Sequence, residues 1–127
     1  MKRVETDQAP QAIGPYAQAV EADGWLYISG QIPLGPDGTL VDGPPAAQAE
    51  RALQNIEAIL RAAGLGKEDV VKTTIFLTDL AHFQAVNEVY ANFFGAHKPA
   101  RSTVQVAALP RGADVEIETI ARRRSNG

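Results

Sequence analysis

Apolar residues recur along this chain at two spacings, one typical of helices and the other of strands. Between residues 46 and 63 the apolar positions are separated alternately by four and three residues, which places them on one face of a helix. Gly64 follows directly, where a glycine commonly ends a helix. The same spacing over residues 83–93 predicts a second helix, with Asp79 as its N-cap and Gly95 at its end.

The segments before, between and after these helices are rich in β-branched and aromatic residues, which predicts strands. Four such segments are clear, and a fifth strand is expected around residues 16–20; the four are residues 25–29, 70–77, 102–108 and 114–121. Two helices alternating with four or five strands predict a two-layer α+β sandwich, in which both helices cover one face of the sheet.

Alternation within the last two predicted strands divides their residues between the two faces of the sheet. Glu116 and Glu118 point away from the apolar residues of the last strand, and Arg101 and Thr103 point away from Val104 in the strand before it. Since the helices can cover only the apolar face, we expect these four polar residues to share the uncovered face. Such a face could be left to water, but its mixture of polar and apolar groups favours contact with another subunit.

The composition limits the chemistry available to this chain. It has 127 residues and a mass of 13.6 kDa, so we expect a single domain over residues 1–127. A domain this small has little core to spare for a deep pocket within one protomer. The lack of cysteine excludes disulfides, thiolate metal ligands and a cysteine nucleophile. The two histidines lie fifteen residues apart, which argues against a metal centre.

Charge and hydropathy favour a soluble protein that does not mainly bind nucleic acid. Twelve Lys and Arg face fifteen Asp and Glu, giving a net charge of −3, whereas a protein that holds phosphate backbones needs a surplus of cations. Residues 1–12 have no apolar signal-peptide core, and no stretch approaches the roughly 20 apolar residues of a membrane span. We therefore expect a cytoplasmic protein without membrane contact.

Two charged positions are candidates for chemistry. Arg101, at the start of a strand, could bind a small carboxylate through two parallel hydrogen bonds. The alternative is a structural ion pair with Glu116 or Glu118 across the hairpin. Glu116, if it is partly desolvated, could orient or deprotonate a water molecule. The alternative for both glutamates is a plain charged strand face.

Other positions give weaker signals. Ser29 and Gly30 end a strand, where a glycine permits close approach of a ligand to the backbone or simply forms a bulge. Tyr16 could place its ring over a site or only pack, and Asn87 could point to a subunit boundary or to solvent. The basic run Arg122–Arg124 is more typical of a solvated tail than of a nucleic-acid contact.

Seven segments, in order from about residue 12 to residue 123, resemble the RidA (YjgF) family. The segments are IGPYAQA (13–19), YISGQIP (27–33), QNIEAIL (54–60), VVKTTIFLTD (70–79), FQAVNEVYANFF (83–94), PARSTVQV (99–106) and VEIETIA (115–121). The resemblance implies a chorismate-mutase-like α+β fold with a mixed sheet, assembled as a homotrimer around a central barrel, with active sites between the subunits.

The activity implied by this resemblance is hydrolysis of reactive 2-iminoalkanoates, such as 2-iminobutanoate and 2-iminopropanoate, to 2-keto acids and ammonia. This reaction protects pyridoxal-phosphate enzymes and requires no metal or cofactor. Two other functions stay open, a small-carboxylate-binding or chaperone-like module and an endoribonuclease of the L-PSP type.

The resemblance also implies roles for individual residues. Arg101 corresponds to the arginine that binds the substrate carboxylate, Gly30 and Thr103 to backbone contacts with the substrate, and Glu116 to the glutamate that positions water. Thr103 stands where many members have cysteine, and the loop over residues 95–98 is shorter than in some members. The positions that line the substrate pocket fall on Tyr16, Ser29 and Asn87.

Overall fold

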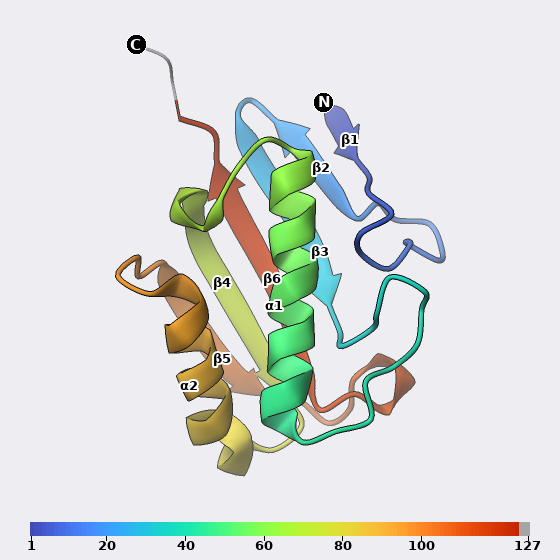
Figure 1. Ribbon diagram of the computed structural model, residues 1–127, viewed down its shortest axis with the longest axis vertical. Helices are drawn as coiled ribbons and strands as arrows, with labels where there is room; N and C mark the ends of the chain where they lie inside the picture. Colours follow the sequence, from blue (N-terminus) through green and yellow to red (C-terminus); the bar gives the residue numbers. More distant parts are fainter. Residues whose placement is uncertain (125–127) are drawn as a thin grey trace.

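The computed structural model describes residues 1–124 and consists of two layers, a six-stranded sheet and two helices packed on one of its faces (Figure 1). The strands lie in the order β1-β2-β3-β6-β4-β5, and β4 and β5 are parallel while the other neighbours are antiparallel. The predicted two-layer α+β sandwich is confirmed, with six strands in place of four or five. The elements are β1 (Lys2–Val4), β2 (Ala19–Ala22), β3 (Trp25–Gln31), α1 (Pro45–Ala62), β4 (Val70–Leu77), α2 (Phe83–Phe94), β5 (Ala100–Gln105) and β6 (Val115–Arg122).

Both helices form where the apolar spacing predicted them. Pro45 begins α1, at a position where its missing N–H costs no hydrogen bond, and Gly64 follows the helix with a φ of +76°. The prediction that Asp79 is the N-cap of the second helix is wrong. Its carboxylate accepts a hydrogen bond from the Ala81 N–H at 2.8 Å and caps a short 3₁₀ turn, and α2 begins after that turn at Phe83.

The hydrophobic core lies between the helices and the sheet face that they cover. We call this the covered face and the opposite side of the sheet the open face (Figure 1). Burial of one large aliphatic side chain in this core stabilises the fold by roughly 1.5–3 kcal/mol. The largest apolar side chains that are at most 1% exposed are Leu26, Leu53, Ile56, Ile59, Leu60, Ile75, Leu77 and Ile117. No helix among the described residues is long and apolar enough to cross a membrane.

The strand β5 lies at one edge of the sheet and differs from its prediction in orientation. It pairs only with β4, where Arg101 lies beside Thr73 and Thr103 beside Ile75. Thr73 and Ile75 are buried under the helices, and residues paired in register point to the same side of a sheet. Arg101 and Thr103 therefore belong to the covered face, and the prediction that they lie on the uncovered face is wrong.

The open face carries the other set of residues from these strands. Val104, Phe76 and Glu116 form one row across β5, β4 and β6, and Val104 is 41% exposed. The prediction that Glu116 and Glu118 point away from the helices is confirmed, because their neighbours Val115 and Ile117 are completely buried. The sheet thus separates Arg101 from Glu116.

Candidate functional site

Arg101 lies at the exposed edge of the sheet, beside α2. Its Nη1 donates a hydrogen bond to the Asn87 side-chain oxygen at 2.7 Å. Its guanidinium carbon lies 4.8 Å from the centre of the Tyr90 ring and 5.4 Å from that of the Phe83 ring, within the range of cation–π attraction. Spacings of four and three residues place these three partners on one face of α2. The helix therefore forms a cradle for the guanidinium.

The positive charge of Arg101 has no carboxylate partner within residues 1–124. The ion pairs in that part of the chain involve other side chains, so the interpretation that Arg101 pairs with Glu116 or Glu118 is wrong. Asn87 occupies one of the five guanidinium N–H groups, which leaves a fork of donors for a ligand. A cavity of about 340 Å³ adjoins it, lined in part by Tyr90, Phe94, His97 and Pro99. This edge can bind a small carboxylate.

The Tyr90 ring in this cradle is itself fixed. Its hydroxyl lies 2.6 Å from the hydroxyl of Thr73, which is the register neighbour of Arg101 on β4. Burial raises the pKa of Tyr90 above its ordinary value, so the hydroxyl stays protonated and can serve as a donor. Tyr90 is 7% and Thr73 1% exposed, so both side chains are buried. Because Thr73 lies beside Arg101, their hydrogen bond keeps the Tyr90 ring next to Arg101.

Thr103 offers its backbone to the same edge. The Val106 N–H bonds to the Leu77 carbonyl at 2.8 Å, and backbone direction alternates along a strand. The N–H and C=O of Thr103 therefore point out from the free edge of β5, near Arg101. Its side-chain hydroxyl oxygen is buried and has no hydrogen-bond partner among the described residues.

Glu116 is the second candidate position, and it lies on the open face. Its carboxyl lies against Gly30, where a Cβ added to the glycine would come within 2.8 Å of the Glu116 Cδ atom. Burial, and secondarily the negative charge of Glu118, raise the pKa of Glu116 above its ordinary value. A carboxylate with this shift is a stronger base than an exposed one, which suits a group that takes a proton from water.

A bulge in the sheet creates the space beside Glu116. The register of β3 against β6 shifts between Ile28 and Gln31, which leaves Ser29 and Gly30 outside the regular ladder. The Ser29 hydroxyl donates to the Ala17 carbonyl at 2.6 Å, so this side chain ties down the loop that precedes β2.

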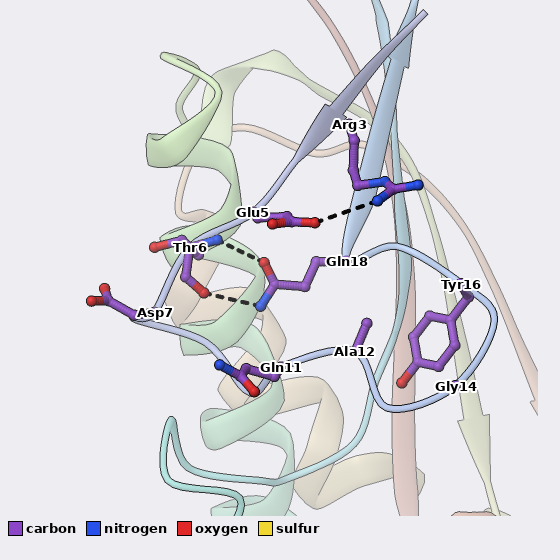
Figure 2. Close-up of a pocket in the computed structure, with 9 residues that line it drawn as sticks. All are labelled: Arg3, Glu5, Thr6, Asp7, Gln11, Ala12, Gly14, Tyr16 and Gln18. Atoms are coloured by element: carbon purple, nitrogen blue, oxygen red, sulfur yellow. Dashed lines mark hydrogen bonds and ion pairs between the residues drawn. The ribbon is translucent and has the colours of Figure 1, made fainter.

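Tyr16 and Gln18 connect this position to a larger pocket. A cavity of about 100 Å³ beside Glu116 is lined by both residues. Both also line a neighbouring pocket of about 570 Å³, where Figure 2 shows Tyr16 on a loop next to Gly14 and Gln18 turned toward Thr6. The Gln18 side chain accepts from the Thr6 N–H at 2.8 Å and donates to the Thr6 carbonyl at 3.1 Å. These bonds fix the N-terminal segment, whose residues 10–12 line the cavity beside Glu116.

The sequence-predicted residues therefore gather at two places. Arg101, Asn87 and Thr103 meet at the edge of β5, on the side of the sheet that α2 covers. Glu116, Gly30, Tyr16 and Ser29 lie together around the bulge of β3, and Glu116 and Gly30 face the open side. The two groups do not form one site within a protomer. No group of three or more His, Asp or Glu residues in the described part of the chain is arranged to hold a metal ion.

Sequence reasoning missed the role of the aromatic residues near Arg101. Phe83 and Tyr90 belong to the apolar stripe of α2, and such a stripe by itself indicates only core packing. The signal that could have distinguished them is the presence of Asn87 at the matching helical spacing. A polar residue inside an apolar stripe indicates a partner that the stripe also contacts.

The arginines of the C-terminal basic run are exposed, as predicted, and they also contact neighbouring elements. Arg123 forms two hydrogen bonds with the Glu21 carboxylate, at 2.7 and 3.0 Å, and a third with a backbone carbonyl of the loop after α1. Arg124 bonds to Asp69 at 2.9 Å, and Arg122 lies over the Trp25 ring. These contacts tie the end of β6 to neighbouring elements, and carboxylates partly neutralise the charges of Arg123 and Arg124.

Gly30→Ala tests the close approach to Glu116. The added Cβ meets the carboxyl end of a flexible side chain, so we expect Glu116 to move while the fold stays intact. A misplaced catalytic group costs on the order of 10- to 100-fold in rate. We therefore expect turnover to fall by about this factor, with the thermal midpoint unchanged. A variant with full activity would show that the position of this carboxyl is unimportant.

Known proteins share this architecture and about half of the residues of this sequence. A family model described as Endoribonuclease L-PSP matches residues 6–123. The chain is 52% identical to a mouse protein named 2-iminobutanoate/2-iminopropanoate deaminase, over 94% of this chain and 90% of that one. The crystal structure of Escherichia coli TdcF with bound serine is 46% identical and superposes with a TM-score of 0.93, covering 98% of this chain and 100% of that one.

A further solved structure, that of the Escherichia coli YjgF gene product, is 48% identical with a TM-score of 0.93 and covers 98% of this chain and 100% of that one. Two helices on one face of a mixed six-stranded sheet thus place this chain in the YjgF class of α+β proteins. The extent of the sequence match allows a narrower statement. The chain belongs to the RidA (YjgF) family.

Proposed function

We propose that this chain hydrolyses reactive 2-imino acids, such as 2-iminobutanoate, to 2-keto acids and ammonia, at sites formed between copies of the chain in a homotrimer. Relatives about 50% identical from three mammals carry the name of this activity, which supports it. The TdcF structure with bound serine supports a site for a small amino-acid-like carboxylate.

The chemistry follows from two groups. Arg101 binds the substrate carboxylate through its free N–H fork and thereby fixes C2 in place. Glu116 accepts a proton from a water molecule, whose oxygen forms a bond with C2 while the electron pair of the C=N bond moves to nitrogen. Glu116 returns this proton to the nitrogen, which gives a tetrahedral carbinolamine. The hydroxyl proton of this adduct then passes through the Glu116 carboxylate to the nitrogen, the C–N bond breaks as the C=O bond forms, and ammonia leaves. Because imines hydrolyse readily, positioning supplies much of the required acceleration.

The observation that carries this proposal is the separation of Arg101 and Glu116 by the sheet. Within residues 1–124 a single copy holds a cation without an ion-pair partner at one edge and a half-buried carboxyl with a raised pKa on the open face. A site that uses both needs the edge of one copy placed on the open face of the next. Exposed apolar side chains support such contact, since Tyr27 and Val104 on the open face are 49% and 41% exposed.

The direct test is an imine-hydrolysis assay. A pyridoxal-phosphate threonine dehydratase generates 2-iminobutanoate, and loss of the imine is followed with and without the purified chain. We expect faster loss with the chain, and a sedimenting mass about three times the 13.6 kDa of one copy. Ligand-dependent stabilisation without hydrolysis would indicate a carboxylate-binding module instead. Cleavage of RNA that survives in Arg101→Ala would indicate a nuclease.

The pH dependence of this activity should reflect the raised pKa of Glu116. The group acts as a base only when ionised, so we expect the enzymatic part of the rate to fall as the pH is lowered through a value above 4.5. In Glu118→Gln the neighbouring charge is gone, so the acidic limb should move to lower pH. An acidic limb that is identical in both proteins would contradict the assignment of Glu116 as the base.

A further inference from the structure

The hydrogen-bond acceptor that Asn87 provides for Arg101 is neutral, and the proposed function does not by itself require this. The Asn87 side chain is neutral, and it accepts a hydrogen bond from Arg101 at 2.7 Å. An aspartate of the same size at this position could form the same bond and an ion pair as well. The structure therefore holds the guanidinium with an acceptor that leaves its charge uncompensated.

The remaining contacts of the guanidinium share this property. The Tyr90 and Phe83 rings attract the cation through their π faces, which orient it without supplying a counter-charge. The Tyr90 hydroxyl is bonded to Thr73 rather than to Arg101. Within residues 1–124 no carboxylate approaches the guanidinium to form an ion pair. The cradle fixes the direction of the donor fork and keeps its full charge for a ligand.

We propose that Asn87 is a positioning residue, whose neutral side-chain oxygen orients the Arg101 guanidinium for a ligand carboxylate without competing for its charge. This assignment rests on the proposed function for the identity of the ligand and goes beyond it, because it gives Asn87 a role through Arg101 instead of through contact with substrate. It also makes the amide, rather than the size of the side chain, the important property of this position.

The decisive variant is Asn87→Asp, which keeps the size and the hydrogen bond and adds a negative charge. The new carboxylate pairs with Arg101 and competes with the ligand, so we expect binding of 2-oxobutanoate, the stable product, to weaken by about 10- to 100-fold. In the imine assay KM should rise by a similar factor while kcat changes little. The thermal midpoint should stay equal or increase, because the variant gains an ion pair.

A matched control lies on the same helix. Asn92 is exposed and lines a groove with Lys67 and Phe93, away from Arg101. Asn92→Asp makes the same change of net charge, and we expect its Kd for 2-oxobutanoate to match that of the unmodified chain. Weaker binding without loss of stability in Asn87→Asp alone would separate a positioning role from a structural one, since loss of a merely structural contact lowers both.

The binding and hydrolysis measurements test the role of Asn87 and the proposed reaction separately. An Asn87→Asp variant that binds 2-oxobutanoate within twofold of the unmodified chain overturns the positioning role, and so does equal weakening in Asn92→Asp. Failure of the unmodified chain to bind 2-oxobutanoate at all also overturns it. If the unmodified chain binds the keto acid but does not hydrolyse the imine, only the proposed reaction fails, and the affinities of the variants still decide the role of Asn87.

Discussion

Arg101→Ala should abolish measurable imine hydrolysis while leaving the fold and the assembly unchanged. Hydrogen bonds to a charged partner contribute roughly 1.5–3 kcal/mol each, and the guanidinium can make two with a carboxylate. Loss of both predicts a fall of about 10²- to 10⁴-fold in kcat/KM. The fold should tolerate the change because Arg101 is exposed and its side chain forms one hydrogen bond within the described residues, with Asn87.

Two further variants make this experiment specific. Arg101→Lys keeps the charge but loses the planar fork, so we expect activity between those of Arg101→Ala and the unmodified chain. Arg61→Ala removes an exposed arginine from α1 that pairs with Glu57, and it should leave turnover unchanged. Sedimentation and thermal midpoints of all three variants should match the unmodified chain. Full turnover by a folded Arg101→Ala variant would rule out the proposed role of the guanidinium.

The helices and the central strands could be predicted because burial imposes a clear pattern on them. In α1 the residues at alternating spacings of four and three are nearly all buried, and in β6 buried residues alternate with less buried ones. Such patterns record which side of an element meets the core. The sequence therefore indicates these elements and their inner faces correctly, including the direction of Glu116.

The orientation of β5 could not be predicted because burial imposes no such pattern on an edge strand. Only Thr103 among its six residues is even partly buried, and Val104 is exposed although it is apolar. The side to which Arg101 points is fixed by its pairing with Thr73, which precedes α2 in the chain, and by the packing of that helix. The alternation of apolar and polar residues within one strand indicates neither this pairing nor the packing of α2. The three-residue strand β1 was missed for the same reason.

Arg101 and Glu116 lie on opposite faces of the sheet, and this placement decides how their charges can be used. The sequence-based expectation placed Arg101 and Glu116 on one face, where they could have neutralised each other within a protomer. The sheet instead keeps them apart, so Arg101 retains its charge and burial keeps the pKa of Glu116 raised. Under the proposed function each copy contributes its edge to one site and its open face to another, and a cyclic assembly is the simplest arrangement that brings these unlike surfaces together.

Two inactive variants should therefore restore activity when they are mixed in one assembly. Arg101→Ala retains Glu116, and Glu116→Gln retains Arg101. In a randomly mixed trimer an intact site needs one variant to provide the edge and the other to provide the open face. This arrangement occurs at roughly a quarter of the sites for an equal mixture, so we expect about a quarter of the full activity. The measurement is turnover after the two chains are co-expressed and the mixed assembly is purified.

Glu116→Gln is suitable for this experiment because it should fold well. A raised pKa in the folded state means that the ionised carboxyl costs stability once the pH exceeds the ordinary value of 4.5, and the neutral amide removes that cost at pH 7. The control is the double variant Arg101→Ala/Glu116→Gln co-expressed with either single variant, which can assemble no intact site and should stay inactive. The mixture of single variants could also be inactive although its subunits exchange normally. That result would mean that Arg101 and Glu116 act within one protomer, and it would contradict the proposal of a site shared between copies.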